Sequence, residues 1–146
     1  METMSAAEYR AYMSVSGTER PPAAKRASPE EDLQRICVEY VEALSRKYPI
    51  LEYLFHPANG GKRPKGEAGK MKALGVKTGV PDLMLPFPSP NRKWQGLALE
   101  LKSPEGKMTE DQRRWLNAAI DGGWLAGLVW DFQDFQTYLD IFLGRN

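Results

Sequence analysis

Apolar residues recur at helical spacing in the first strongly patterned part of the chain. Ser28-Pro29-Glu30-Glu31 has the sequence of a capping box, with Ser at the N-cap, Pro at the first helical position and Glu at the third. The apolar residues that follow share one helical face: Leu33, Ile36, Cys37, Tyr40 and Leu44. The pattern predicts a helix that Pro49 ends, and the short apolar run at residues 50–55 favours a strand.

Turn residues and strands occupy the middle of the chain. His56-Pro57-Ala58-Asn59-Gly60-Gly61 predicts a turn-rich break, and a short helix is expected at residues 67–74. Residues 82–86 and 97–102 have the pattern of two strands joined by a proline-containing loop.

The last third of the chain predicts a helix, a strand and a helix. Thr109-Glu110-Asp111-Gln112 is a second capping box, and its helix is expected to end at Gly122-Gly123. The apolar face of this helix would contain Trp115, Leu116, Ala119 and Ile120. Residues 124–130 are almost continuously apolar, as in a buried strand. Asp131 would cap a final helix with an apolar stripe of Phe132, Phe135, Leu139 and Phe142.

This order of elements predicts an α/β fold with a central mixed sheet of about four strands between helices. We expect one folded domain over residues 28–146, because 146 residues are enough for one hydrophobic core. Residues 1–27 are polar and without sustained periodicity, so we expect disorder there, apart from a short helix near residues 6–13.

Composition excludes several classes of protein and site. A single cysteine and a single histidine exclude an internal disulfide, a multi-cysteine zinc site and a two-histidine metalloprotease motif. No apolar run approaches 18 residues, and the N-terminus lacks the pattern of a signal peptide. We therefore expect a cytoplasmic protein without a membrane partner.

Charge is unevenly distributed although the net charge is only +1. Residues 60–80 contain six basic side chains and one acidic side chain, Glu67. This basic segment is either a surface that contacts phosphate groups or a solvated loop.

The candidate chemistry lies on the two central strands. Side chains alternate along a strand, so Leu97, Leu99 and Leu101 face the core, whereas Ala98, Glu100 and Lys102 face the other side, where the small Ala leaves room for a ligand.

If the two strands pair as a hairpin, Asp82 meets Glu100 at one end. Two convergent carboxylates suit a hard divalent cation such as Mg²⁺. The alternative is a charge cluster with Lys102 on a solvated sheet face.

Five motifs in this order resemble the VRR-NUC branch of the PD-(D/E)xK nucleases. They are Glu31-x-x-Gln34, the segment from His56 to Arg63, Gly79-Val80-Pro81-Asp82, Glu100-Leu101-Lys102, and a helix that begins with Gln112 and Trp115. The resemblance covers about residues 28–140 and implies the restriction-endonuclease-like core of that superfamily.

The resemblance implies a catalytic role for five residues. Asp82 and Glu100 correspond to the metal-binding pair, and the backbone carbonyl of Leu101 would be a further ligand. Glu31 corresponds to an acid on the first helix that completes the metal shell. Lys102 corresponds to the catalytic lysine, and Gln112 to a glutamine that reaches toward the site. The implied cofactor is Mg²⁺ or Mn²⁺, with no small-molecule cofactor.

The implied substrate is DNA, with a branched molecule such as a Holliday junction as the expected form. Phosphate contacts would come from Lys62, Arg63, Lys70, Lys72, Lys77, Asn59 and His56. Stand-alone relatives are phage or bacterial proteins that form homodimers, so a homodimer in a bacterial or phage-infected cytoplasm is implied. The alternatives are a branched-DNA-binding module without turnover and a structural α/β protein.

Several candidate residues have a structural explanation that needs no function. Glu31 and Gln112 each occupy the third position of a capping box. His56 and Asn59 suit an ordinary turn. Cys37 and the tryptophans 115, 124 and 130 suit the core, whereas Trp94, beside Arg92 and Lys93, is a candidate for nucleic-acid contact.

Overall fold

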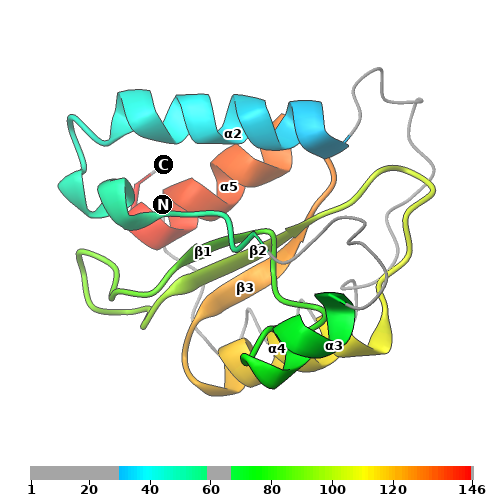
Figure 1. Ribbon diagram of the computed structural model, residues 1–146. Helices are drawn as coiled ribbons and strands as arrows, with labels where there is room; N and C mark the ends of the chain where they lie inside the picture. Colours follow the sequence, from blue (N-terminus) through cyan, green and yellow to red (C-terminus); the bar gives the residue numbers. More distant parts are fainter. Residues whose placement is uncertain (1–29, 59–66, 146) are drawn as a thin grey trace.

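The computed structural model describes residues 30–58 and 67–145 (Figure 1). The predicted disordered segment 1–27, the short helix predicted near residues 6–13, Ser28 and Pro29 lie outside the described residues. The elements, in chain order, are α2 (Glu30–Leu44), the 3₁₀ helix η1 (Pro49–Tyr53), α3 (Glu67–Ala73), β1 (Leu83–Leu85), β2 (Leu97–Leu101), α4 (Glu110–Asp121), β3 (Leu125–Val129) and α5 (Phe132–Leu143).

A sheet between two helical layers forms the body of the protein. Helices α2 and α5 cover one face of the sheet and α4 covers the other, with α3 beside α4 (Figure 1). The predicted α/β class is confirmed. None of the described helices has the length and apolar character needed to cross a bilayer.

The sheet has three strands in the order β1-β2-β3 within the described part of the chain. Strands β1 and β2 are antiparallel, with Leu83 opposite Leu99, and β2 and β3 are parallel, with Leu97 opposite Leu125. The prediction of about four strands is therefore wrong by one.

The missing strand is the one predicted at residues 50–55. Pro49–Tyr53 instead forms η1, with the Leu51 amide donating to the Tyr48 carbonyl at 3.0 Å. Only Phe55 pairs with the sheet, through an isolated bridge to Met84. A short apolar run buries Leu51 equally well from a turn of helix, so apolar content alone does not select a strand.

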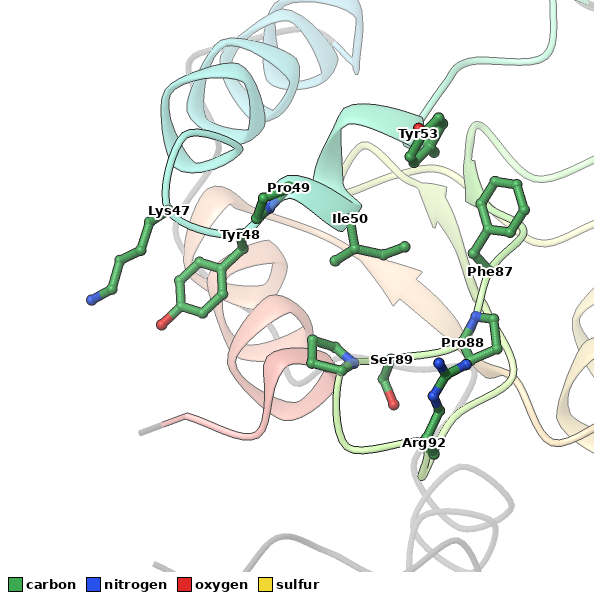
Figure 2. Close-up of a pocket in the computed structure, with 10 residues that line it drawn as sticks. Lys47, Tyr48, Pro49, Ile50, Tyr53, Phe87, Pro88, Ser89 and Arg92 are labelled. Atoms are coloured by element: carbon green, nitrogen blue, oxygen red, sulfur yellow. The ribbon is translucent and has the colours of Figure 1, made fainter.

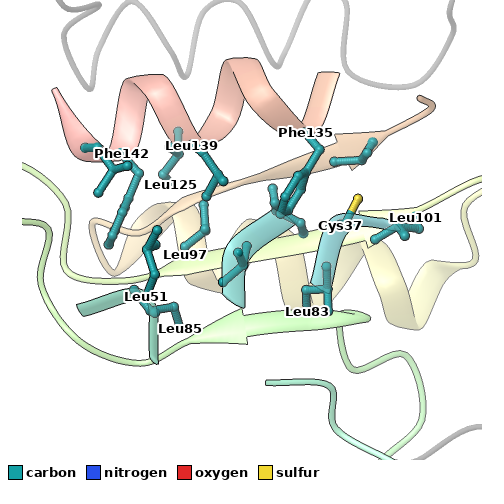
Figure 3. Close-up of a cluster of buried hydrophobic side chains, with 14 of the residues drawn as sticks. Cys37, Leu51, Leu83, Leu85, Leu97, Leu101, Leu125, Phe135, Leu139 and Phe142 are labelled. Carbon is teal, nitrogen blue, oxygen red and sulfur yellow. The ribbon is translucent and has the colours of Figure 1, made fainter. Parts of the chain in front are cut away.

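The main hydrophobic core lies between the sheet and helices α2 and α5 (Figure 3). Helix α2 contributes Leu33, Cys37 and Val41, which follow one another at four-residue spacing. Ile36, predicted on this face, is 42% exposed because its position lies on the flank of that stripe. The α5 stripe is as predicted, with Phe135, Leu139 and Phe142 fully buried and Phe132 partly buried.

A second, smaller core lies between the sheet and α4. It contains Ala98, Leu116, Ala126 and Leu128, with Trp124 and Trp130 packed against it. The core interpretation of these two tryptophans is confirmed. Trp94 is also buried, with 1% of its surface exposed, in the main core. The prediction that Trp94 contacts nucleic acid is wrong, because the loop that contains it folds back on the sheet.

Both predicted caps in the last third of the chain are present. The Thr109 hydroxyl accepts from the Gln112 amide at 3.2 Å, and the Gln112 side chain accepts from the Thr109 amide at 2.9 Å. The Asp131 carboxylate accepts from the Asp134 amide at the start of α5. These local bonds fix where α4 and α5 begin. The first turn of α4 lies against the segment before β1.

Gly79 allows that close approach. Its φ is +80°, and a Cβ built on it would lie 2.5 Å from the Asp111 carbonyl carbon and 2.7 Å from the Gln112 amide nitrogen. The same segment is tied to α4 by Thr78, whose hydroxyl donates to Asp111 and whose carbonyl accepts from the Trp115 indole.

We expect Gly79→Ala to destabilise the protein and to displace the start of α4. Gly75→Ala is the matched control, because Gly75 has a φ of +97° and nothing within 4 Å of its virtual Cβ. The control should cost about 1 kcal/mol of unfolding free energy through backbone strain alone, and Gly79→Ala about 1–3 kcal/mol more through overpacking. Urea denaturation measures both. Equal losses of unfolding free energy in the two variants would show that α4 can shift away from residue 79 without destabilising the protein.

Candidate functional site

Asp82 and Glu100 converge at the end of the β1–β2 hairpin, as predicted. The antiparallel register that pairs Leu83 with Leu99 places Asp82 opposite Glu100, one position beyond β1. The Asp82 Oδ2 accepts a hydrogen bond from the Leu101 amide at 2.8 Å, and Asp82 is close enough for its charge to raise the pKa of Glu100. Asp82 is half-buried, so this end of the hairpin is open to solvent on one side.

Gln112 connects Glu100 to Lys102. Its Nε2 donates to Glu100 Oε1 at 2.9 Å, and its Oε1 accepts from Lys102 Nζ at 2.8 Å. The same Oε1 also accepts from the Thr109 amide. The capping bond of Gln112 and its place in this cluster are therefore compatible, because one side chain makes both sets of bonds. Lys102 Nζ lies 3.7 Å from Glu100 Oε1, which completes a closed polar cluster.

The cluster is buried, contrary to two expectations from the sequence. Only 4% of Glu100 and 7% of Lys102 is exposed, and Ala98 is fully buried. The solvated charge cluster is therefore wrong. The expected room beside Ala98 is also wrong, since Leu116 of α4 shares its small core there.

Burial raises the pKa of both carboxyl groups. The pKa of Glu100 rises to about 8, first because burial removes water from its carboxylate and then because Asp82 places a negative charge beside it; Lys102 opposes the rise. Burial also raises the pKa of Asp82, against the hydrogen bond from Leu101. Two neighbouring carboxylates that resist ionisation are stabilised by a proton or by a cation between them.

The unsatisfied oxygen of Glu100 fits a cation. Its Oε2 is buried and accepts no hydrogen bond, although buried carboxylate oxygens are normally satisfied. Within residues 30–58 and 67–145, no cluster of three His, Cys, Asp or Glu side chains is arranged to hold a metal ion. The two carboxylates nevertheless suit Mg²⁺, which takes few protein ligands and keeps several waters.

Glu30, rather than Glu31, is the acid of the first helix that adjoins this site. The Glu30 Oε1 accepts from the Ser103 amide at 2.8 Å, and its charge raises the pKa of both Asp82 and Glu100. Glu31 is the next residue along the helix, and both glutamates are exposed, so burial does not distinguish them. The sequence offered two adjacent glutamates, and only the packing of α2 beside the end of β2 distinguishes them.

His56 lies beside Asp82 instead of in an isolated turn. Its Nδ1 is 2.6 Å from the Asp82 carbonyl oxygen. Because a carbonyl oxygen only accepts, Nδ1 carries the hydrogen, and Nε2 is left for a further partner. The ring is exposed, so His56 is accessible to a ligand at the site.

The described part of the basic segment is exposed. Lys70 and Lys72 are on α3, which has no buried residue, and Lys77 follows it. The bonds of Thr78 to α4 hold Lys77 near the helix that positions Gln112. Asn59, Lys62 and Arg63 lie outside the described residues.

The raised pKa of Glu100 predicts how metal-free stability depends on pH. The folded state favours the protonated carboxyl, so its contribution to stability is complete below the ordinary pKa of 4.5 and is lost as pH rises through about 8. In EDTA, the melting temperature should therefore fall by several degrees between pH 5.5 and pH 8.5. Glu100→Gln, which is uncharged at both pH values, should remove most of this fall. An equal fall in the melting temperature of the variant would show that other titrating groups cause the pH dependence.

Comparison with known proteins identifies the family of the chain and supports its fold. The family model described as the VRR-NUC domain matches residues 28–129. A solved structure described as a VRR_NUC domain protein has the same fold, with a TM-score of 0.64 and 21% identity over 82% of this chain and 91% of that chain. No curated protein matches the chain. Since the family model spans more than half of its residues, the chain belongs to the VRR-NUC domain family, a nuclease domain of the PD-(D/E)xK type.

Proposed function

We propose that this protein is a metal-dependent nuclease that hydrolyses phosphodiester bonds in DNA. The observation that carries the proposal is the carboxyl pair of half-buried Asp82 and buried Glu100, in which Glu100 Oε2 has no hydrogen-bond donor. Lys102 and Gln112 are bonded into the same cluster. A structural role would be better served by a cluster without an unsatisfied oxygen.

Asp82, Glu100 and the carbonyl of Leu101 would hold Mg²⁺ or Mn²⁺, which polarises a phosphate and acidifies a bound water. Glu30 is a better candidate than Glu31 for a water-mediated contact, since its charge acts on both carboxyl groups. Lys102 would orient the attacking water or offset negative charge that develops on the phosphate. Gln112 would hold the Lys102 ammonium and the Glu100 carboxylate in fixed positions relative to each other, through its hydrogen bonds to both.

The basic segment and His56 would position DNA without recognising its sequence. Lys70, Lys72 and Lys77 are exposed cations on the side of the protein where α4 begins. Contacts of this kind bind the phosphate backbone and depend strongly on salt.

We expect the variant with Lys70→Gln and Lys77→Gln to bind DNA less tightly and with a weaker salt dependence. Each lost phosphate contact removes close to one unit from the slope of log affinity against log salt concentration. Fluorescence anisotropy at several salt concentrations, in EDTA, measures the slope. Arg35→Gln with Arg46→Gln is the control, because these exposed cations lie on α2 and just after it, on the opposite face of the sheet. Equal slopes in all three proteins would make the basic segment a solvated loop.

Cleavage of a labelled four-way junction tests the proposed function. The same assay should include linear duplex, single-stranded and flap substrates, each with Mg²⁺, with Mn²⁺ and with EDTA. Cation-dependent cleavage supports the nuclease, and preference for the junction supports a branched substrate. Junction binding without cleavage would support the alternative, a non-catalytic branched-DNA-binding module. Sedimentation velocity of the same sample tests the proposed homodimer.

A further inference from the structure

A cavity of about 610 Å³ lies between η1 and the loop after β1, away from the carboxyl pair (Figure 2). Its volume is within the range of about 300–1,000 Å³ that is typical of small-ligand sites. Tyr53 and Phe87 stand on one side, Tyr48 stands on the other, and Ile50 lies between them (Figure 2). None of the groups discussed in the nuclease site contributes to this cavity.

Aromatic side chains are exposed along this edge of the sheet. Tyr53 is 53% exposed and Phe87 is 44% exposed, and their rings meet edge to face at a centroid distance of 5.2 Å. Phe55, two residues after Tyr53, is 47% exposed. Tyr53 and Phe87 therefore form an exposed aromatic pair, and exposed apolar side chains that gather in this way mark binding surfaces.

The rim of the cavity is cationic. Lys47 and Arg92 are the charged residues among those that line it, and no carboxylate does. Tyr48 is held in place by cations, with the Lys47 ammonium 5.5 Å and the Arg145 guanidinium 5.4 Å from its ring centroid. Aromatic faces beside cations bind nucleobases and phosphates together. A symmetric contact with a second copy of the chain would instead place two cationic rims opposite each other, where they would repel.

Two chain segments connect the cavity to Asp82. Strand β1 separates Phe87 from Asp82 by five residues, at most about 17 Å at the rise of a strand. The segment after η1 runs antiparallel beside it, from Tyr53 through the Phe55–Met84 bridge to His56, which bonds to Asp82. The cavity is thus at most about five nucleotides from the carboxyl pair, at 3.4 Å per nucleotide of stacked strand.

We propose that this aromatic cavity binds an unpaired base of single-stranded nucleic acid, so that the substrate carries a single-stranded segment within about five nucleotides of the cut. Tyr53 and Phe87 stack on the base, and Arg92 contacts an adjoining phosphate. The inference rests on the proposed function for its place beside the cut, but base binding itself requires no turnover.

Anisotropy with two oligonucleotides tests the proposal in EDTA. One is a fluorescein-labelled 12-mer of thymidine nucleotides, and the other has the same length and charge but abasic sugars in its central half. Tyr53→Leu with Phe87→Leu keeps apolar side chains and removes the aromatic faces. We expect about tenfold weaker binding of the thymidine 12-mer by this variant, within the range measured for base–aromatic stacking, and unchanged binding of the abasic 12-mer.

Two further variants separate the contributions. Arg92→Asn removes the charge and keeps a residue that tolerates the φ of +63° found there, and it should weaken binding of both oligonucleotides equally. Ile36→Ala removes an exposed apolar side chain from α2 and should change neither. Thermal melting of each variant checks that it is folded.

Equal affinity of the unaltered protein for the two oligonucleotides would overturn the proposal. A halved mass of the leucine variant in sedimentation velocity, with unchanged affinity for the thymidine 12-mer, would also overturn it and make the cavity a contact between copies. A different result would refute the proposed nuclease function. Base-dependent binding without cation-dependent cleavage of any substrate would refute the nuclease and keep the cavity as a base-binding site.

Discussion

Asp82→Ala and Glu100→Ala are each expected to abolish DNA cleavage while the protein remains folded. The two carboxyl groups form one site, so the loss of either removes half of the charge that would hold a divalent cation. The expected loss exceeds the about 10²–10³-fold that removal of one charge-stabilising group costs. Cleavage at saturating Mg²⁺ or Mn²⁺ measures it. Near-normal turnover by either variant would contradict the assignment.

Asp82→Asn and Glu100→Gln separate charge from shape. Asp82→Asn keeps an oxygen for the Leu101 amide, which Asp82→Ala leaves without its acceptor. Each amide also relieves the repulsion between the carboxylates, so metal-free melting temperatures should stay the same or rise. Asp121→Asn, at the exposed end of α4, is the control for loss of one carboxylate elsewhere. Lower melting temperatures together with lost cleavage would indicate a structural role for the pair.

Lys102→Met is expected to reduce cleavage by roughly a hundredfold or more, the usual scale for a group that positions a proton or stabilises charge. Metal binding should persist, because both carboxylates remain and no longer pair with a competing cation. Gln112 should also keep its place, since its Oε1 still accepts from the Thr109 amide. The variant therefore removes the ammonium, leaves Gln112 bonded at the start of α4, and raises the pKa of Glu100 further, which saturating metal offsets.

Two measurements distinguish the catalytic from the structural role of Lys102. Isothermal titration with Mn²⁺ reports metal binding, and single-turnover cleavage reports chemistry. Tight binding with little cleavage supports a role in catalysis. Cleavage restored at high Mn²⁺ would show that Lys102 only balances charge. Lys107→Met, an exposed lysine in the loop after β2, is the control and should change neither measurement.

Local patterns in the sequence determined most of the elements. The Thr109 box and Asp131 placed the starts of α4 and α5, because capping depends on bonds between residues three positions apart. Strict alternation in β2 assigned Leu97, Leu99 and Leu101 to one core and Glu100 to the other face. The hairpin then brought Asp82 to Glu100.

Predictions from these local patterns were wrong where two different backbone conformations can bury the same residues. The run at residues 50–55 became the helix η1, since Leu51 reaches the core from either backbone. Trp94 entered the core with its loop, although neighbouring charges had suggested an exposed position. In both places, distant contacts outweighed the local preference.

Tertiary structure alone decided the electrostatics of the site. The sequence by itself determined that Glu100 and Lys102 share one face of their strand, because strand alternation is a local property, whereas the hairpin that brings Asp82 to Glu100 was only a condition until the register was known. Only the packing of α4 over the sheet buries Glu100 and Lys102, and only the placement of α2 selects Glu30 over Glu31. The raised pKa of Glu100 and its unsatisfied Oε2 follow from that burial, which depends on contacts between residues far apart in the chain.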